Sequence, residues 1–267
     1  MPITVKDILD IIEQIAPASL AEDWDNVGLM IGNPSASIDS ILIGLDPTLS
    51  LLEEARACGA NLLITHHPFI FHPIKSVKLD SPEGVFIERA IRDRINVISC
   101  HTNLDSAVEG VSNSLARKLG LQDTAPLVVH PDTDQCGMGC IGKFREPISG
   151  DKFIDILREA CSAPWLLATS NKPAEISCVA VCGGSCSELA PLALEKGAQV
   201  FVTSEVKHST ARWAEQAGLW VVDGGHFATE NQAFDVFSDR LATESKRQCN
   251  TVDIHITKQQ ISPLLLV

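Results

Sequence analysis

The sequence lacks a long uninterrupted hydrophobic run and an excess of positive charge. No stretch reaches the ~20 apolar residues that a helix needs to cross a bilayer, and the first ten residues carry charges where a signal peptide would be apolar. We therefore expect a cytoplasmic protein without a membrane partner. The chain has 21 Lys and Arg and 34 Asp and Glu, which gives a formal net charge of −13. We therefore expect no broad nucleic-acid-binding surface, and nucleic acid could bind only at a local basic patch. A small molecule is the expected partner.

Internal repeats, low-complexity tracts and heptad patterns are also missing. Of the 267 residues, 45% are hydrophobic and 21% are charged, a balance typical of globular proteins that excludes disorder for most of the chain. The nine cysteines are odd in number, and several fall inside apolar runs, so we expect reduced thiols. The length suits one large domain or two medium ones.

Short apolar runs alternate with amphipathic helical patterns along the first half of the chain. Thr4 and Asp7 fit a capping box at the start of a first helix that ends before Pro17. The same patterns then predict strands at 41–45, 62–65 and 97–100, and helices at 49–58, 84–94 and 111–119. This βαβ alternation is typical of a parallel sheet with helices on its faces.

A polar stretch, Gln122 to Gln135, interrupts this alternation and predicts a domain boundary. After it the patterns predict strands at 139–144, 165–168, 176–181, 199–203, 219–222 and 252–256, and helices at 152–161, 188–196, 210–216 and 230–243. The expected fold class is α/β, with two linked α/β domains whose mainly parallel sheets are flanked by helices. We expect residues 1–125, completed by 222–267, to form the first domain and residues 126–221 the second.

Polar residues cluster directly after three of the predicted strands. The groups that follow strands 62–65, 97–100 and 219–222 are, in turn, His66 with His67, His101 with Asp105, and Asp223 with His226 and Glu230. In open α/β sheets ligand sites form at this edge, because the loops that follow the strands converge there.

His66 and His67 are neighbours in the chain, and side chains of an extended segment alternate between opposite sides. Pro68 favours an extended backbone at His67, so we expect one ion to have difficulty reaching both rings. Two ions roughly 3.5–4 Å apart could take one imidazole each, with Asp105 and Glu230 as bridging carboxylates. A His-His-Pro sequence alone is more often a surface turn, but the whole constellation favours a metal site.

Two further predictions concern the third group of polar residues. His226 would be an additional terminal ligand of the same ions. Thr229 and Gln232 fit a capping box that would begin a helix at Glu230 and place this carboxylate at a positive helix N-terminus.

The remaining patterns give little indication of a functional site. Cys178, Cys182 and Cys186 match no common zinc or iron–sulfur spacing, and we interpret them as core residues. The segment 183–185, Gly-Gly-Ser, lacks the full dinucleotide or P-loop pattern and is a weak candidate for phosphate binding. No Ser-His-Asp or Cys-His arrangement for nucleophilic catalysis is legible.

Five segments together resemble one known family. They are WDNVGLMIG at 24–32, ITHHPFIF at 64–71, HTNLD at 101–105, TSEVKH at 203–208 and DGGHFATE at 223–230. In this order, over nearly the whole chain, they resemble the GTP cyclohydrolase I type 2 family, also described as NGG-interacting-factor-like proteins. The length resembles the short form of the family. TSE and KHS depart from the usual TGE and KHH, which puts substrate contacts near His208 in doubt.

The resemblance implies two linked α/β domains, a toroidal homohexamer and a dinuclear metal site in each subunit. Carried over motif by motif, it implies the metal ligands His66, His67, Asp105, His226 and Glu230. Imidazole and carboxylate ligands without thiolate suit two divalent ions of Zn, Mn, Fe, Co or Ni.

Two functions are compatible with such a site. The first is a metal-dependent hydrolase in which metal-bound hydroxide opens the imidazole ring of GTP and releases formate, with His101 as proton shuttle or as support for a ligand. The second is a metal-containing interaction or regulatory protein without turnover. The resemblance to a family name is weaker evidence than the site, because such a centre can also serve phosphoester or amide hydrolysis.

Overall fold

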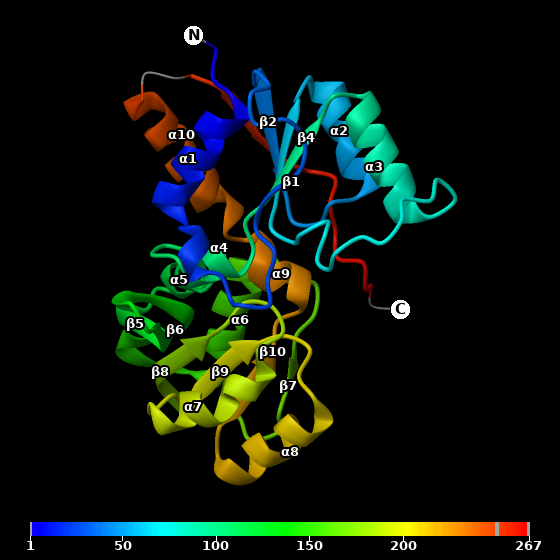
Figure 1. Ribbon diagram of the computed structural model, residues 1–267. Helices are drawn as coiled ribbons and strands as arrows, with labels where there is room; N and C mark the ends of the chain where they lie inside the picture. The colour runs from blue at the N-terminus through cyan, green and yellow to red at the C-terminus, as the bar shows by residue number, and fades with distance from the viewer. Residues whose placement is uncertain (1, 249–250, 266–267) are drawn as a thin grey trace. The chain divides into compact units, whose positions relative to one another are not determined.

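The computed structural model describes residues 2–248 and 251–265, and the chain divides into two compact units (Figure 1). The first unit comprises Met1–Leu104 and Phe234–Ile261, and the second comprises Asp105–Ala233 and Ser262–Val267. The chain enters the second unit within helix α4 (Thr102–Ser106) and returns between α9 (His226–Asn231) and α10 (Phe234–Arg247). Each unit has its own sheet and core, and among the described residues no helix is long and apolar enough to cross a membrane.

The sheet of the first unit has five strands in the order β1-β4-β3-β2-β11. β2, β3, β4 and β11 run parallel, and β1 pairs antiparallel with β4 at one edge. This is the mainly parallel sheet that the sequence predicts. The strands are β1 (Gly28–Ile31), β2 (Ser40–Gly44), β3 (Leu62–Thr65), β4 (Asn96–Ser99) and β11 (Asp253–Ile256).

Helices cover both faces of this sheet. α2 (Leu49–Cys58) and α3 (Pro82–Arg92) share a core with side chains of β2, β3 and β4. α1 (Val5–Ile15) packs against α10, which in turn contacts β2. The predicted capping box of α1 is confirmed, because the Thr4 amide donates to the Asp7 carboxylate and the Asp7 amide donates to the Thr4 hydroxyl. A short helix, η1 (Ala18–Leu20), follows α1.

The sheet of the second unit has six strands in the order β5-β6-β8-β9-β10-β7. The pairs β8–β9 and β9–β10 are parallel, whereas β5–β6, β6–β8 and β10–β7 are antiparallel. The prediction of mainly parallel pairing therefore fails in this sheet, although the α/β class is confirmed. The strands are β5 (Gln122–His130), β6 (Thr133–Ser149), β7 (Leu167–Ala168), β8 (Glu175–Val181), β9 (Val200–Thr203) and β10 (Trp220–Asp223).

This sheet is also covered on both faces. One core joins α5 (Val111–Lys118) and α6 (Gly150–Cys161) to the sheet, and a second joins α7 (Ala190–Glu195) and α8 (His208–Ala217) to the opposite face. η2 (Ser187–Leu189) leads into α7. Because Leu115 of α5 and Leu119, which follows this helix, lie in the second unit's core, the structural division falls after residue 104 and not after residue 125, where we expected it.

The polar stretch that we expected to be a boundary is instead a β-hairpin made by β5 and the start of β6. Leu127 is the one fully buried residue of β5, so this strand shows no clear alternation of apolar and polar side chains. Pro126 is accommodated because β5 is an edge strand, which can tolerate a residue without a backbone N–H.

The predicted helix at 230–243 is also wrong at its start. Glu230 lies near the end of α9, and a break at 232–233 separates α9 from α10. The Thr229 hydroxyl donates to the Gly225 carbonyl, which is typical of a helix interior and not of an N-cap. Glu230 therefore does not occupy the positive N-terminus that the capping-box pattern suggested.

Candidate metal site

Three neighbouring parallel strands of the first unit end at one edge of the sheet. In register, Gly44 of β2 lies opposite Thr65 of β3, and Thr65 lies opposite Ser99 of β4. The residues that follow these strands are Asp46, the pair His66 and His67, and His101, in that order along the sheet. The strand order thus gathers three of the predicted site residues at one edge, as the alternation of strands and helices suggested.

Three histidines of the first unit, His66, His67 and His101, are each held through Nδ1 by an oxygen acceptor. Nδ1 of His66 donates to the Cys100 carbonyl oxygen at 2.8 Å. Nδ1 of His67 donates to Oδ1 of Asp46 at 2.7 Å, and Nδ1 of His101 donates to Oδ1 of Asp25 at 2.9 Å. An oxygen acceptor at Nδ1 requires that the neutral ring carries its proton there, so the lone pair lies on Nε2.

These rings form one cluster. The centroid of the His66 ring lies 5.2 Å from that of His67 and 5.2 Å from that of His101, and each residue offers a ligand atom within 4.8 Å of the others. The expectation that His66 and His67 point to opposite sides is therefore wrong. The reason is local, because the chain bends at both residues after β3 and does not continue extended.

The donor set fits a metal ion. Histidines that bind metals usually donate their second ring N–H to a carboxylate or a backbone carbonyl, which fixes the ring and makes the ligand nitrogen more basic. All three histidines of this cluster follow that pattern. The structure therefore has histidine groups that could hold a metal ion.

The acid that holds His101 is itself fully buried. The Asp25 side chain has 0% exposure, and its second carboxylate oxygen accepts from the Thr102 amide and the Thr102 hydroxyl. Burial alone would raise the pKa of Asp25, but the hydrogen bonds from His101 and Thr102 outweigh it and hold the pKa at about 2. Asp25 is thus an anion that orients His101.

The second unit contains the other three predicted ligands. His226 and Glu230 lie one turn apart on α9, with Nε2 of His226 3.1 Å from Oε2 of Glu230. Nδ1 of His226 donates to Oε1 of Glu205 at 3.2 Å, so this histidine is held in the same way as those of the first unit. Asp105 is buried in α4.

A glycine loop encloses the Glu230 carboxylate. A Cβ on Gly184 would lie 2.2 Å from Oε1 of Glu230, and the Gly184 φ of +71° also favours glycine. The amides of Gly183 and Gly184 donate to the Ser112 and Thr229 hydroxyls. These N–H groups are therefore used within the protein, which argues against the phosphate-loop interpretation of residues 183–185.

Three cysteines and Asp223, which the sequence also singled out, have roles in the packing and loop structure of the second unit. Cys182 is buried beside Cys186, and the contact with Cys186 and the burial both raise the pKa of its thiol well above its usual value, which disfavours a thiolate ligand. Asp223 accepts from the amides of Val206 and Gly225 and so shapes the loop before α9. Cys178 and Cys186 are half-buried, and Cys249 lies outside the described residues.

Sequence reasoning assigned no role to the acids that orient the histidines. Asp46 and Glu205 also follow the ends of strands, so the pattern that singled out the histidines applies to them as well. Asp25 lies in the loop before β1, where no strand end marks it.

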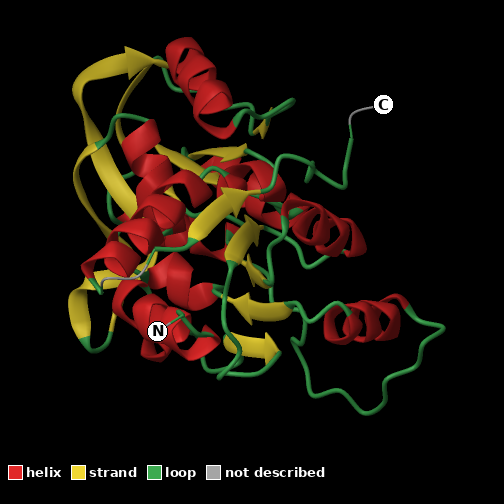
Figure 2. Ribbon diagram, turned by 90° about the horizontal axis from the view of Figure 1, so that it is seen from above, coloured by secondary structure: helices red, strands yellow, loops and turns green. Residues whose placement is uncertain are grey.

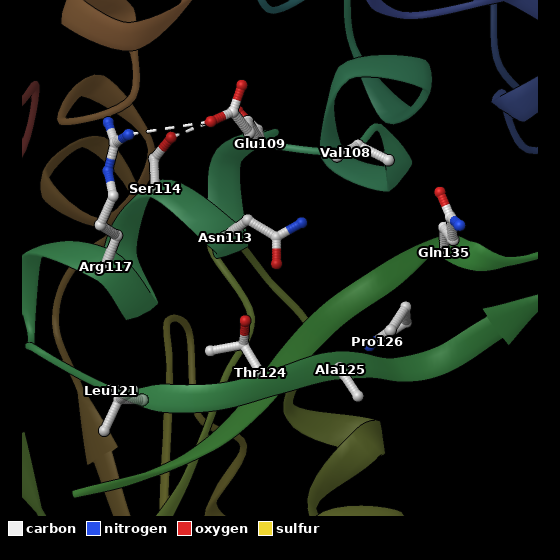
Figure 3. Close-up of a pocket in the computed structure, with 10 residues that line it drawn as sticks. All are labelled: Val108, Glu109, Asn113, Ser114, Arg117, Leu121, Thr124, Ala125, Pro126 and Gln135. Atoms are coloured by element: carbon white, nitrogen blue, oxygen red, sulfur yellow. Dashed lines mark hydrogen bonds and ion pairs between the residues drawn. The ribbon is translucent and has the colours of Figure 1, made fainter. Parts of the chain in front are cut away.

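A cavity of about 330 Å³ lies in the second unit between α5 and the β5–β6 hairpin (Figure 3). At its rim Arg117 lies 3.9 Å from Glu109, and the Ser114 hydroxyl donates to the Glu109 carbonyl. None of the predicted site residues lines it.

Solved structures similar to this chain have the same fold. A hypothetical protein of Staphylococcus aureus matches with a TM-score of 0.94 at 25% identity over 100% of both chains. The structure described as reduced HcgD from Methanocaldococcus jannaschii matches with a TM-score of 0.81 at 27% identity, over 96% of this chain and 98% of that one.

Sequence comparisons agree over the same length. A Clostridium acetobutylicum protein named GTP cyclohydrolase 1 type 2 homolog is 30% identical over 264 residues, which cover 98% of each chain. A Nostoc protein of the same name is 34% identical over 203 residues, or 75% of this chain and 76% of its own. The model of the family Duf34/NIF3 (NGG1p interacting factor 3) matches residues 3–263. The chain therefore belongs to the Duf34/NIF3 family.

Proposed function

We propose that this protein is a dinuclear metal-dependent hydrolase that opens the imidazole ring of GTP and releases formate. The observation that carries the proposal is the set of Nδ1 hydrogen bonds, which direct the ligand nitrogens of His66, His67 and His101 into one cluster. The name GTP cyclohydrolase 1 type 2 homolog, which relatives carry, supports the choice of substrate.

In this proposal two divalent ions are held by His66, His67, Asp105, His226 and Glu230. Nitrogen and oxygen ligands without thiolate suit Zn, Mn, Fe, Co or Ni. When bound, such ions supply Lewis acidity and lower the pKa of water towards neutrality. Asp105 and Glu230 are both buried, and bound cations would balance their charge there.

His101 is the proposed proton shuttle. Asp25 holds Nδ1 of His101, so proton exchange takes place at Nε2, and the Asp25 anion stabilises the ring when it becomes positively charged. His66 lies next to it, with ring centroids 5.2 Å apart, so His101 is also within reach of a ligand role. Metal content separates the two roles, because a shuttle can be removed without loss of metal.

Elemental analysis tests the ligand assignment. We expect about two ions per chain in the wild type and a clear loss in the His67→Ala, Glu230→Ala double variant. His255→Ala is a matched control, because this histidine is exposed on β11. Unchanged occupancy in the double variant would refute the ligand set.

Formate release from GTP tests the reaction. Asp105→Asn keeps the shape of the side chain but removes its charge, so we expect most of the activity to be lost. His101→Ala is expected to retain the metal and to be slower by about 10²–10⁴-fold. A metal-loaded wild type that is inert towards GTP and towards a panel of nucleotides and phosphoesters would favour the alternative, an interaction or regulatory protein.

We propose a homohexamer as the assembly, supported by the resemblance of the motifs to the family. Dimers are the commonest closed assemblies, so the sequence pattern without the resemblance would not predict a hexamer. Light scattering over a wide range of concentrations is the test. A monomer or dimer throughout would refute the hexamer and leave the metal site unaffected.

A further inference from the structure

Two exposed aromatic side chains lie beside the histidine cluster of the first unit. Trp24 is 58% exposed and Phe71 is 39% exposed, and their ring centroids are 5.8 Å apart. The ring centroid of His101 lies 6.2 Å from that of Trp24 and 6.4 Å from that of Phe71. Apolar rings thus meet water directly next to the imidazoles, where the proposed reaction would take place.

Hydrogen bonds of neighbouring residues hold the chain segments that carry both aromatic side chains. Trp24 precedes Asp25, whose carboxylate holds His101 and Thr102. The Asn26 side chain donates to the carbonyl of Ile70, the residue before Phe71, and so ties the two segments together. Phe71 itself lies near the start of the loop between β3 and α3, which both views show as a long connection without regular structure (Figures 1 and 2).

We propose that Trp24 and Phe71 form an aromatic platform on which a planar nitrogen heterocycle of the substrate stacks, so that its reacting carbon lies beside the histidine cluster. The inference rests on the proposed function and specifies which part of the substrate is recognised. The two rings are tilted by 50°, so the heterocycle stacks on one of them with its edge towards the other, and both rings lie beside His101.

The formal net charge of −13 disfavours the approach of a nucleotide's phosphates to the chain as a whole, and stacking of the neutral ring is not subject to that repulsion. Stacking of a base on an aromatic side chain contributes about 1–3 kcal/mol, or roughly 5- to 150-fold in affinity.

A second copy of the chain is the competing occupant of this surface. Ile74, Val77 and Leu79, farther along the same loop, are exposed as well, and an interface between copies would cover them together with Phe71. The ring contacts distinguish the two cases, because Trp24 and Phe71 contact His101. The geometry therefore favours a small planar ligand at the platform.

Tryptophan fluorescence tests the platform without turnover. The probe is guanosine monophosphate, with ribose 5-phosphate as the matched compound that has the same phosphate and sugar but no heterocycle. The tryptophan fluorescence of the metal-loaded wild type is expected to be quenched by guanosine monophosphate and not by ribose 5-phosphate. Trp24→Phe should lose the quenching, retain the metal and bind nearly as the wild type does in a calorimetric titration.

Substitutions without an aromatic ring should weaken binding. Trp24→Ala and Phe71→Leu are each expected to raise the dissociation constant for guanosine monophosphate by at least about 5-fold at unchanged metal content. Trp213→Ala is the control, since Trp213 is 36% exposed on α8 of the second unit. Equal affinity of wild type and Trp24→Ala, or equal binding of ribose 5-phosphate, would overturn the platform.

Oligomeric state and formate release separate the remaining outcomes. A change of oligomeric state in Trp24→Ala or Phe71→Leu by light scattering would assign the surface to a second copy and overturn the inference. Binding through Trp24 without formate release would refute the hydrolase and support the platform. Formate release with an unchanged KM in Trp24→Ala would support the hydrolase and refute the platform.

Discussion

Replacement of Asp25 by Asn should destabilise the first unit by an amount that follows from its pKa. The substitution keeps the shape of a fully buried side chain and removes the charge that accepts hydrogen bonds from His101 and Thr102. The folded-state pKa is about 2, against 3.8 for the free group. Since one pKa unit corresponds to about 1.4 kcal/mol, the anion contributes about 2 kcal/mol to the free energy of unfolding at neutral pH.

The pH dependence of this contribution has a definite sign. A carboxyl group whose pKa is lowered by folding stabilises the protein fully above its unfolded pKa and loses this effect as the pH falls towards the folded pKa. For Asp25 the window runs from about pH 4 down to pH 2, with about half of the contribution lost by pH 3. The difference between wild type and Asp25→Asn should therefore shrink as the pH falls through this window.

Urea unfolding of both proteins at pH 7, 4 and 3 measures this difference, with ~2 kcal/mol expected at pH 7. Asp23→Asn is the control, because Asp23 is an exposed acid of the same loop. A variant as stable as the wild type at pH 7, or a difference that stays constant down to pH 3, would refute the conclusion that hydrogen bonds hold Asp25 ionised.

Three further changes test other parts of the structure. Gly184→Ala should lower metal content and the urea midpoint, because its Cβ would meet the Glu230 carboxylate; Gly197→Ala, with open space around its Cβ, should lower only the midpoint. If Gly184→Ala bound as much metal as the wild type, the contact between its Cβ and the Glu230 carboxylate would not matter for the site. Asp7→Ala should cost about 1 kcal/mol in urea unfolding through loss of the α1 capping box, and no measurable loss would rule out that role. Phe201→Ala should cost about 3–5 kcal/mol in the same assay, and a cost under about 1 kcal/mol would contradict its place in the core.

The sequence predicts much of the first unit because its parallel strands are short and buried on both faces. β3 and α2 begin and end where the patterns predict, and all four residues of β3 are buried. His66, His67 and His101 follow strand ends as predicted, and the adjacency of β3 and β4 places His101 near the other two. The five proposed ligands themselves stay a prediction, because no metal has been measured.

The parts that the sequence does not predict depend on contacts between distant segments. The exposed edge strand β5 lacks the alternation of apolar and polar side chains that marks a half-buried strand, so the sequence pattern does not predict its pairing with β6. At Thr229 a hydroxyl that suits an N-cap also suits a bond to the carbonyl four residues earlier, and the structure has the second arrangement. Local pattern cannot decide between the two, because Gly184, which donates to the same hydroxyl, is 45 residues away.

The acids that orient the histidines show why a ligand pattern in the sequence is only part of a site. Asp46 lies 21 residues before His67, and Asp25 lies 76 residues before His101, so no local motif contains both partners. Parallel strands solve this problem for Asp46 and His67, because they end at a common edge and place a ligand from one strand beside an acid from the next, whereas Asp25 reaches His101 from the loop before β1. These acceptors can then fix the tautomer of each ring before any ion binds, and this reduces the ordering that binding would otherwise require.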